Sequence, residues 1–520
     1  MRMRKIFFLA ALSLSLLAQA AGIEYYKTLI DEQSDASKGS TMLYSLEFTA
    51  DSSLYLLSSY QTSSAEEVGL HFDNNTYEGG TASKWGSKAG EYKYTNMRNS
   101  FLAKLDAQGN LIWAKPDTTG DYDLAGTAMA VTADGGVIYV DKFRCRKGNY
   151  MSFINLYSKE GNLVASNNMA FTSDSMVIGD NKVARNDAFS WAGVVQDEDG
   201  FVYLAGYHAD TLLPTWKDSI APRKAWDYQG SKSDACNTVL LKYQPQYNVF
   251  MDMDYVGAVI NADELISDRP LGVHYENGKI YLAGAYKSET ESGIYATCYN
   301  TALEREFIVY HPIDGALQFQ QTKFEDGKIF VCGGLSKGSI TVGEKTLETQ
   351  GNYNHGLIYV MNMTDGSLVN ATIRSAANNA LNITVAAFPT ETGFVAYNHE
   401  TLNGISMKLN YDEQLNLIST DTLATGGGSS TISAVGRNMD GELTAVGFRA
   451  RTTNDFDMLG ETMNFSELTN WYSVLAVLSK NSKEQAVENV EAESEKTVKF
   501  IRNGQLFIRH NGKVYNALGY

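Results

Sequence analysis

The chain has 520 residues, of which 31 are Tyr, 22 Phe and 45 Gly but only 7 Pro, a composition that favours a turn-rich β protein over a helical one. This length fits either two or three ordinary domains or one large repeat architecture. The formal net charge is −17, and because an acidic surface repels phosphate backbones, nucleic acid is excluded as an expected partner.

The first 20 residues are typical of a signal peptide. MRMRK is cationic, residues 6–17 are apolar, and AQA at residues 18–20 supplies the small residues that a signal peptidase needs. The apolar run is too short for a transmembrane helix of roughly 20 residues, and no Cys follows the cleavage site to carry a lipid anchor. We therefore expect an exported chain with no transmembrane segment after signal cleavage.

Between residues 21 and 481 one short phrase recurs in seven copies. It reads GFVYLAGYHA from Gly200 and GKIYLAGAYK from Gly278. A turn residue opens each copy, and in most copies an aromatic residue follows three positions later, which gives its side chain a fixed place on one face of a strand. The turn residues are Ser52, Gly136, Gly200, Gly278, Gly327, Gly393 and Gly441, and the aromatic residues are Tyr55, Tyr139, Tyr203, Tyr281 and Phe330.

Each phrase is the second strand of a four-stranded unit. An apolar strand precedes it, as in TAMAVTAD at residues 127–134, and a second hairpin follows, as in SFLAKLDAQGNLIWAK from Ser100. Four-stranded antiparallel sheets that repeat at intervals of about 45 to 85 residues are typical of a β-propeller, in which each blade covers the apolar face of its neighbour. The sequence therefore predicts an all-β fold, a seven-bladed β-propeller over residues 21–481.

The seventh unit lacks a fourth strand in the sequence that follows it. Its third strand ends near residue 480, where the chain becomes charged, whereas IEYYKTLI at residues 23–30 stands ahead of the first unit without a hairpin partner. We expect residues 23–30 to pair with residues 472–480 as the outer strand of blade seven. Closing the ring in this way removes two open sheet edges that would otherwise invite aggregation.

Residues 100–140 carry a family resemblance. The segment FLAKLDAQGNLIWAKPDTTGDYDLAGTAMAVTADGGVIYV resembles the repeat of a bacterial family of seven-bladed β-propellers, and the third, fourth and fifth units resemble it less closely. The resemblance implies an extracytoplasmic protein that binds a partner or serves as a scaffold. It supplies no catalytic residue.

The C-terminal part is a separate unit. Residues 482–496 form a charged run that we interpret as a linker, and residues 497–520 hold two Asn-Gly turns between three short alternating strands, which predicts a small β-meander. The meander, with VYNALG near its end, resembles the C-terminal sorting signals of Bacteroidota proteins exported by the type IX secretion pathway, although it stops at Tyr520 without their usual final strand. The resemblance implies recognition by the outer-membrane export machinery and a cell-surface or extracellular location. If the tail is not functional, we expect the protein to stay in the periplasm. The alternative role of the tail is to cap the propeller.

The sequence shows no recognisable catalytic or metal site. Its 7 His include no His-x-x-x-His pair, and no Gly-x-Ser-x-Gly elbow occurs. We therefore expect no cofactor, no metal and no catalytic residue. Cys145, Cys236, Cys298 and Cys332 either form two disulfides or, as we expect for most of them, are buried small apolar residues.

Long connections concentrate on one face of the expected ring. Antiparallel alternation places the connections from strand two to three and from strand four to the next blade on one rim, and residues 60–99, 207–236, 334–355 and 448–471 are long insertions of the first kind. We expect binding on this long-loop face, because rigid scaffolds often display functional residues on long loops. The candidate binding residues are Trp85, Trp216, Trp226 and Tyr228, with Tyr92, Tyr94, Phe456 and Phe465 as further exposed-looking rings; the alternative is that these rings pack the loops onto the rim.

The sequence thus favours an exported, non-enzymatic β-propeller that binds a glycan or protein partner through its long-loop face and carries a C-terminal export or surface-attachment signal. A carbohydrate-active enzyme with carboxylates at the propeller channel is the alternative, because a fold does not determine function. Two carboxylates about 5 to 10 Å apart beside the channel on the long-loop face would favour that enzyme. A structural spacer without a concave pocket is the third possibility.

Overall fold

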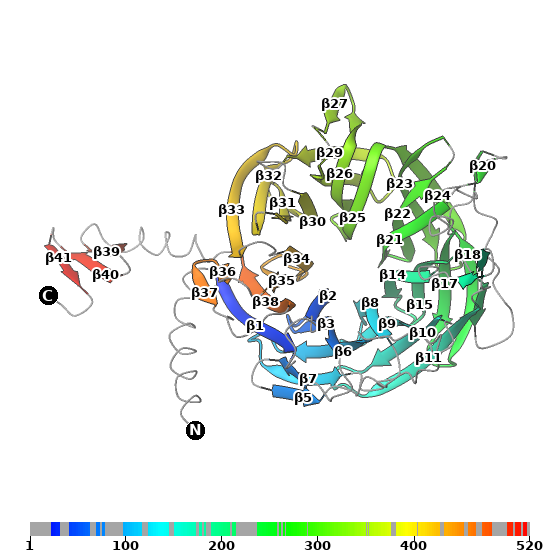
Figure 1. The fold of residues 1–520 in the computed structure, drawn as a ribbon, viewed down its shortest axis with the longest axis horizontal. Helices are drawn as coiled ribbons and strands as arrows, with labels where there is room; N and C mark the ends of the chain where they lie inside the picture. Colours follow the sequence, from blue (N-terminus) through cyan, green and yellow to red (C-terminus); the bar gives the residue numbers. More distant parts are fainter. Residues whose placement is uncertain are drawn as a thin grey trace.

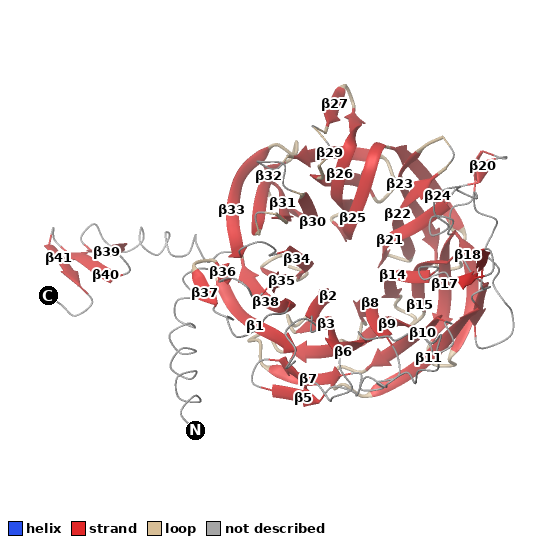
Figure 2. Cartoon of the chain, in the orientation of Figure 1, coloured by secondary structure: helices blue, strands red, loops and turns tan. Residues whose placement is uncertain are grey.

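The computed structural model shows a ring of β-sheets around a central axis, with the first strand of each sheet nearest the axis (Figure 1). All secondary structure in the described residues is strand (Figure 2). Within that described part, no helix has the length and apolar character needed to cross a membrane. The structure describes residues 22–31, 41–62, 69–72, 75–78, 97–116, 123–144, 150–172, 176–178, 181–183, 189–208, 211–214, 237–256, 259–261, 264–265, 267–288, 290–349, 351, 353–375, 381–402, 404–426, 431–451, 456–463, 471–480, 497–502, 505–510 and 513–516.

Seven sheets form the blades, and in the first six the four blade strands follow one another from the axis outward in chain order. The predicted all-β, seven-bladed propeller is thereby confirmed. Blades 1 to 4 consist of β2 (Thr41–Phe48), β3 (Leu54–Thr62), β6 (Met97–Leu105) and β7 (Leu111–Pro116); β8 (Asp123–Val131), β9 (Val137–Arg144), β10 (Tyr150–Tyr157) and β11 (Leu163–Thr172); β14 (Phe189–Gln196), β15 (Val202–His208), β17 (Asn237–Gln244) and β18 (Val249–Tyr255); and β21 (Ser267–Glu276), β22 (Lys279–Lys287), β23 (Ser292–Asn300) and β24 (Arg305–Pro312).

The remaining strands complete the ring and add three small sheets. Blades 5 to 7 consist of β25 (Asp314–Glu325), β26 (Lys328–Val342), β28 (His355–Asn362) and β29 (Leu368–Arg374); β30 (Asn382–Thr390), β31 (Gly393–Glu400), β32 (Ile405–Asp412) and β33 (Leu417–Gly426); and β34 (Thr431–Arg437), β35 (Leu443–Arg451), β38 (Trp471–Ser479) and β1 (Ile23–Asp31). The small sheets are β12 (Met176–Ile178) with β13 (Asn181–Val183), β19 (Val259–Asn261) with β20 (Glu264–Leu265), and β39 (Thr497–Arg502) with β40 (Gln505–His510) and β41 (Lys513–Asn516).

The N-terminal strand closes the ring as the sequence predicts. β1 pairs antiparallel with β38, in a register that runs from Ile23 opposite Leu478 to Leu29 opposite Ser473. The N–H of Ser479 also donates to the carbonyl of Gly22 at 3.1 Å. The last strand of blade 7 therefore comes from the opposite end of the chain, and the expected pairing is confirmed.

Three of the long insertions place a strand on the outer edge of the preceding blade. β4 (Gly69–Phe72) and β5 (Asn75–Glu78) leave blade 1 and extend blade 7 beyond β1; β16 (Thr211–Pro214) leaves blade 3 and pairs with β11; β36 (Phe456–Met458) and β37 (Glu461–Met463) leave blade 7 and extend blade 6 beyond β33. In blade 5, β27 (Lys345–Glu348) folds back on β26 and projects from the ring (Figure 1). The described strands of the first three insertions therefore cover sheet edges, which protects the edges from pairing with other chains.

The turns between first and second strands show why the repeated phrase needs its opening residue. Ser52, Gly200 and Gly278 have φ of 61°, 83° and 77°, a left-handed conformation that tight hairpin turns require. Blade 2 corrects the expected frame, because Gly135 with φ 81° takes this position instead of Gly136.

The shifted frame in blade 2 changes the direction of its aromatic side chain. Tyr203 packs in a core cluster with Ile280 of the following blade, whereas Tyr139 packs with Tyr55 of the preceding blade and Ile138 takes the forward-facing place. A one-residue shift moves a strand side chain to the other face of the sheet, so the expectation that Tyr139 repeats the place of the other rings is wrong.

Polar contacts at the short-turn face join successive blades. The Tyr55 hydroxyl donates to the carbonyl of Gly135 in blade 2 at 2.8 Å. The Lys242 ammonium and the Tyr203 hydroxyl of blade 3 both donate to the carbonyl of Thr301 in blade 4, at 2.6 and 3.2 Å. Side chains of the second and third strands therefore connect each of these two blades to the turn of the next one.

Each inner strand carries a β-bulge at a matching place, where the register with the second strand shifts. The shifts lie between Leu43 and Ser45, Gly126 and Ala128, Trp191 and Gly193, Pro270 and Gly272, Phe319 and Thr322, Thr384 and Ala386, and Ile432 and Ala434. A bulge re-aims the side chains beside it. In blade 4 the bulged residue is Leu271, whose side chain lines a cavity between blades 4 and 5.

The described cysteines are free. Cys298 and Cys332 are buried thiols without a disulfide, and burial raises the pKa of the Cys298 thiol to about 11. Cys145 and Cys236 lie outside the described residues. The alternative with two disulfides is wrong, because it needs all four cysteines.

The predicted signal peptide and linker also lie outside the described residues. Residues 497–516 contain the three antiparallel strands β39, β40 and β41, in the place of the expected meander. The domain boundaries and the role of the tail stay predictions.

Candidate functional site

Most candidate rings of the long-loop face lie outside the described residues: Trp85, Trp216, Trp226, Tyr228, Tyr92, Tyr94 and Phe465. Phe456 is described and is only 1% exposed. Its ring centroid lies 5.9 Å from that of Phe448 and 6.3 Å from that of Tyr472. This ring fixes β36 to the core instead of facing a ligand, so the expectation of an exposed aromatic is wrong at this position.

A cleft opens between blades 4 and 5 on the face of the long connections. It consists of a larger cavity of about 520 Å³ and a smaller one of about 380 Å³, and both are lined by Lys287, Ser292 and Gly315. These residues stand at the end of β22 and the starts of β23 and β25. Antiparallel alternation brings those three strand ends to one rim, and we refer to the two cavities together as the blade 4–5 cleft.

The larger cavity combines an apolar wall with an arginine on an aromatic ring. Leu271, Leu317 and Phe319 line it and are half-buried. The Arg269 guanidinium lies 4.9 Å from the ring centroid of Tyr207, which comes from the neighbouring blade 3. A guanidinium stacked on a ring in this way is held by cation–π attraction, which limits the orientations that it adopts.

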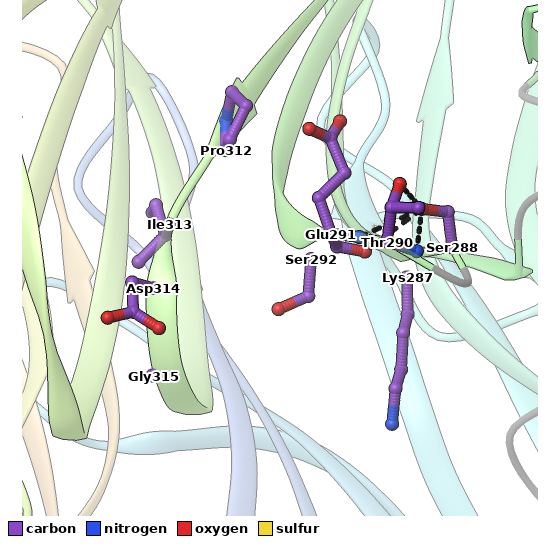
Figure 3. Close-up of a pocket in the computed structure, with 9 residues that line it drawn as sticks. All are labelled: Lys287, Ser288, Thr290, Glu291, Ser292, Pro312, Ile313, Asp314 and Gly315. Atoms are coloured by element: carbon purple, nitrogen blue, oxygen red, sulfur yellow. Dashed lines mark hydrogen bonds between the residues drawn. The ribbon is translucent and has the colours of Figure 1, made fainter.

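The smaller cavity lies between two short stretches of chain (Figure 3). On one side, the hydroxyl of Ser288 accepts the N–H groups of Thr290 and Glu291 at 3.2 and 3.1 Å. The Tyr286 hydroxyl donates to Glu291 Oε1 at 2.9 Å, and burial together with this carboxylate raises the pKa of Tyr286 above its ordinary range. The turn therefore holds the Glu291 carboxylate in place at the edge of the cleft.

The opposite side is the crossing from blade 4 to blade 5. Only Ile313 separates β24 from β25; it is buried, and its N–H donates to the carbonyl of Ser292 at 2.8 Å. Gly315 has φ 118°, and a Cβ there would lie 2.8 Å from the Cα of Gly338. The crossing is thus fixed by a buried anchor and by a backbone conformation that favours glycine, so both walls of the cleft are built on rigid elements.

Charges are separated along the cleft. Arg269 lines only the larger cavity, Lys287 lines both cavities, and no carboxylate stands among the described residues that line the larger one. Glu291 and Asp314 line the smaller cavity from its two sides. The arrangement offers one end with Arg269 and apolar walls and another end with two carboxylates and hydroxyl groups, with Lys287 shared between them, which suits an elongated polar ligand.

Two carboxylates of the inner strands, Glu47 and Glu325, lie at the other end of the propeller. Glu325 stands at the short-turn end of β25, where its Oε1 accepts from Arg437 Nη1 at 3.2 Å. Burial raises the pKa of Glu325 and Arg437 opposes that rise; burial likewise raises the pKa of Glu47, opposed by Lys323. In the described part of the chain, no three His, Cys, Asp or Glu side chains gather as a metal site.

Known proteins resemble the chain at the level of architecture alone. No protein-family model and no curated protein matches it. Among solved structures, a Dos1 propeller has 10% identity and a TM-score of 0.39, with 84% of this chain and 94% of that chain covered. A virginiamycin B lyase from Staphylococcus aureus has 9% identity and a TM-score of 0.36, with 86% and 99% covered. A quinohemoprotein alcohol dehydrogenase from Pseudomonas putida has 11% identity and a TM-score of 0.39, with 87% and 76% covered. Resemblance this distant says nothing of ligand or activity.

Sequence reasoning missed every residue of the blade 4–5 cleft. One usable signal was present, since Arg269-Pro270 stands at the start of an inner strand and Lys287 at the end of a second strand, both positions of the long-loop face. Loop length drew attention to the insertions instead, although the cleft is formed by strand ends beside two short connections.

Proposed function

We propose that this protein is an exported, non-enzymatic β-propeller that binds a glycan or a protein segment in the blade 4–5 cleft. The observation that carries the proposal is the cleft itself, with half-buried apolar side chains and fixed polar groups at the long-loop face. Its volumes lie in the range of natural ligand sites, roughly 300 to 1,000 Å³. The proposal keeps the face expected from the sequence and moves the contact residues from the insertions to the strand ends.

Support also comes from the way the cleft is built. Tyr207, Arg269 and Phe319 belong to three successive blades, so the site depends on the assembled ring. Sites on rigid elements lose little conformational entropy when a ligand binds. A structural spacer would have no need of a cleft that combines a stacked arginine, apolar walls and two carboxylates.

The test is a binding screen with the mature chain on glycan and host-protein arrays. Phe319→Ala and Tyr207→Ala each remove a ring from the wall of the larger cavity, and we expect each to weaken the selected ligand by about tenfold or more, as loss of a buried aromatic contact does. Tyr247→Ala is the matched control, because Tyr247 is 69% exposed at a turn on the opposite face. Equal binding by all three variants would refute the assignment to this cleft.

The same screen separates the two sets of candidate residues on the long-loop face. Trp216→Ala combined with Trp226→Ala tests the insertion residues expected from the sequence, while Phe319→Ala tests the cleft. Loss of binding only in the tryptophan double variant would return the site to the insertions.

One observation favours a second function, glycoside hydrolysis. Glu291 and Asp314 line the same cavity from opposite sides (Figure 3), and glycosidases work with a pair of carboxylates that flank the bond to be cleaved. Glu291→Gln and Asp314→Asn distinguish the functions. A hydrolase would lose turnover of oligosaccharides in either variant, whereas a binding protein releases no reducing sugar in any form.

The proposed export rests on residues 1–20 and 497–520. We expect removal of residues 497–520 to keep the protein in the periplasm of a bacterium with a type IX pathway, as detected by fractionation. Unchanged release to the surface would contradict the sorting role of the tail and favour its role as a cap.

A further inference from the structure

We propose that the ligand of the blade 4–5 cleft is an acidic oligosaccharide, with the carboxylate of a uronic acid unit at Arg269 and the hydroxyl groups of the next unit at Glu291 and Asp314. This inference rests on the proposed function and names the ligand class for the same cleft. It is carried by the separation of charge, by the stacked arginine and by the apolar wall between the two ends.

The cationic end stands out against the charge of the whole chain. With 60 acidic and 43 basic residues the chain carries a net charge of −17, yet among the described residues the charged side chains that line the larger cavity are those of Arg269 and Lys287. Asp268, next to Arg269 in β21, is 1% exposed and accepts the N–H of Thr238. Alternation along the strand directs Asp268 and Arg269 to opposite faces, so Arg269 and not Asp268 lines the larger cavity, where a guanidinium attracts an anion.

The position of Arg269 suits a carboxylate. Its guanidinium lies over the ring of Tyr207 at 4.9 Å, and the residue opposite it on β22 is the small Ala285. Stacking uses the face of the guanidinium, while a carboxylate binds along its edge through two parallel N–H···O bonds. A planar carboxylate fits this geometry better than a single hydroxyl group does.

The middle and the acidic end suit a sugar. Leu271, Leu317 and Phe319 give the larger cavity an apolar wall against which the C–H face of a pyranose ring packs. Glu291 and Asp314 accept hydrogen bonds, as hydroxyl groups require, and Ser292 joins the two cavities. A free anion such as sulfate would leave the apolar wall and the acidic end without a partner.

The test uses the mature full chain and isothermal titration calorimetry with three oligosaccharides of equal length. One carries uronic acids, the second is its carboxyl-reduced neutral counterpart, and the third is the neutral chain with sulfate groups. We expect the uronate to bind about tenfold or more tightly than either of the others, because charge-assisted bidentate bonds are the stronger kind.

Variants connect this preference to the cleft. We expect Arg269→Met to lower the affinity for the uronate by about tenfold and to leave the affinity for the neutral oligosaccharide unchanged. Lys287→Gln should lower the affinity for the uronate by a smaller factor of about threefold. Lys345→Met, an exposed lysine on the projecting β27, is the matched control and should change nothing. Lys287→Gln keeps the test decisive if Arg269→Met does not fold, as judged from its circular dichroism spectrum.

The outcomes separate this inference from the proposed function. Equal affinity for uronate and neutral chain, with both lost in Phe319→Ala, would overturn the inference and keep the binding function. Tighter binding of the sulfated chain would overturn the inference in the same way. If none of the three oligosaccharides binds, the inference is overturned. The proposed function then stands only if the chain binds a protein from the array and Phe319→Ala abolishes that binding.

Discussion

Replacement of Leu29 by Ala tests whether the N-terminal strand closes the ring. Leu29 is fully buried, and it packs in one cluster with Leu43 of blade 1, Leu70 of β4 and Leu475 of β38. A buried Leu→Ala change costs about 2 to 5 kcal/mol from lost apolar burial and the cavity left behind. Because β1 is paired on both edges, we expect a loss of stability near the upper part of that range.

The assay is urea denaturation of the mature chain, followed by tryptophan fluorescence and by far-ultraviolet circular dichroism. Glu24→Ala is the control, because Glu24 lies on the same strand and is exposed; we expect its effect to stay within about 0.5 kcal/mol. Equal unfolding curves for Leu29→Ala and Glu24→Ala would refute the packing of β1 between β38 and β4. A chain that starts at residue 32 should aggregate, since it would expose the edges of β38 and β4.

Three further predictions concern contacts between and within blades. Lys242→Met should lower stability by about 1 to 3 kcal/mol, measured as a lower thermal midpoint, because it removes a charge-assisted bond to the carbonyl of Thr301 in the next blade. Arg374→Ala should cost about 3 kcal/mol, since it leaves the buried Glu400 carboxylate without the guanidinium at 3.3 Å, and adding Glu400→Gln should recover part of that loss in urea denaturation. Burial lowers the pKa of His399 to about 4, below the unfolded value of about 6.5. Because the unfolded chain then binds the proton more readily than the folded protein, His399 lowers the stability of the fold at acidic pH. This loss of stability is absent above pH 6.5 and grows as the pH falls toward 4, by roughly 1.4 kcal/mol per pH unit at most. His399→Gln should flatten this slope in urea titrations between pH 7 and 4, and an unchanged slope would contradict the buried, neutral imidazole.

The sequence alone determined the blades because their signals are local. A residue that tolerates positive φ opens each hairpin, as at Gly200 and Gly278, and alternation of apolar side chains defines the strands on either side. Ring closure was also readable, since a missing fourth strand at one end of the chain matched an unpaired strand at the other. Each of these inferences needs only neighbours in sequence or a count of strands.

Tertiary structure decided which residues meet. Only the observed φ of Gly135 shows that blade 2 is shifted by one residue and that Tyr139 faces blade 1. Likewise, β4, β16 and β36 pair with the preceding blade, although nothing in their sequences indicates which sheet edge they join. Edge pairing is made by backbone groups that every residue carries, so it leaves little trace in the sequence.

The blade 4–5 cleft is likewise a product of the tertiary structure. Tyr207, Arg269 and Phe319 stand far apart in the chain and come together because three blades are placed around one axis. Periodicity predicts that such side chains lie at strand ends, but the distance between ends of different blades depends on sheet twist, on the bulge at Leu271 and on the one-residue crossing at Ile313. The sequence therefore determined the repeated unit and its number, while the packing of whole sheets against one another decided where a ligand can be held.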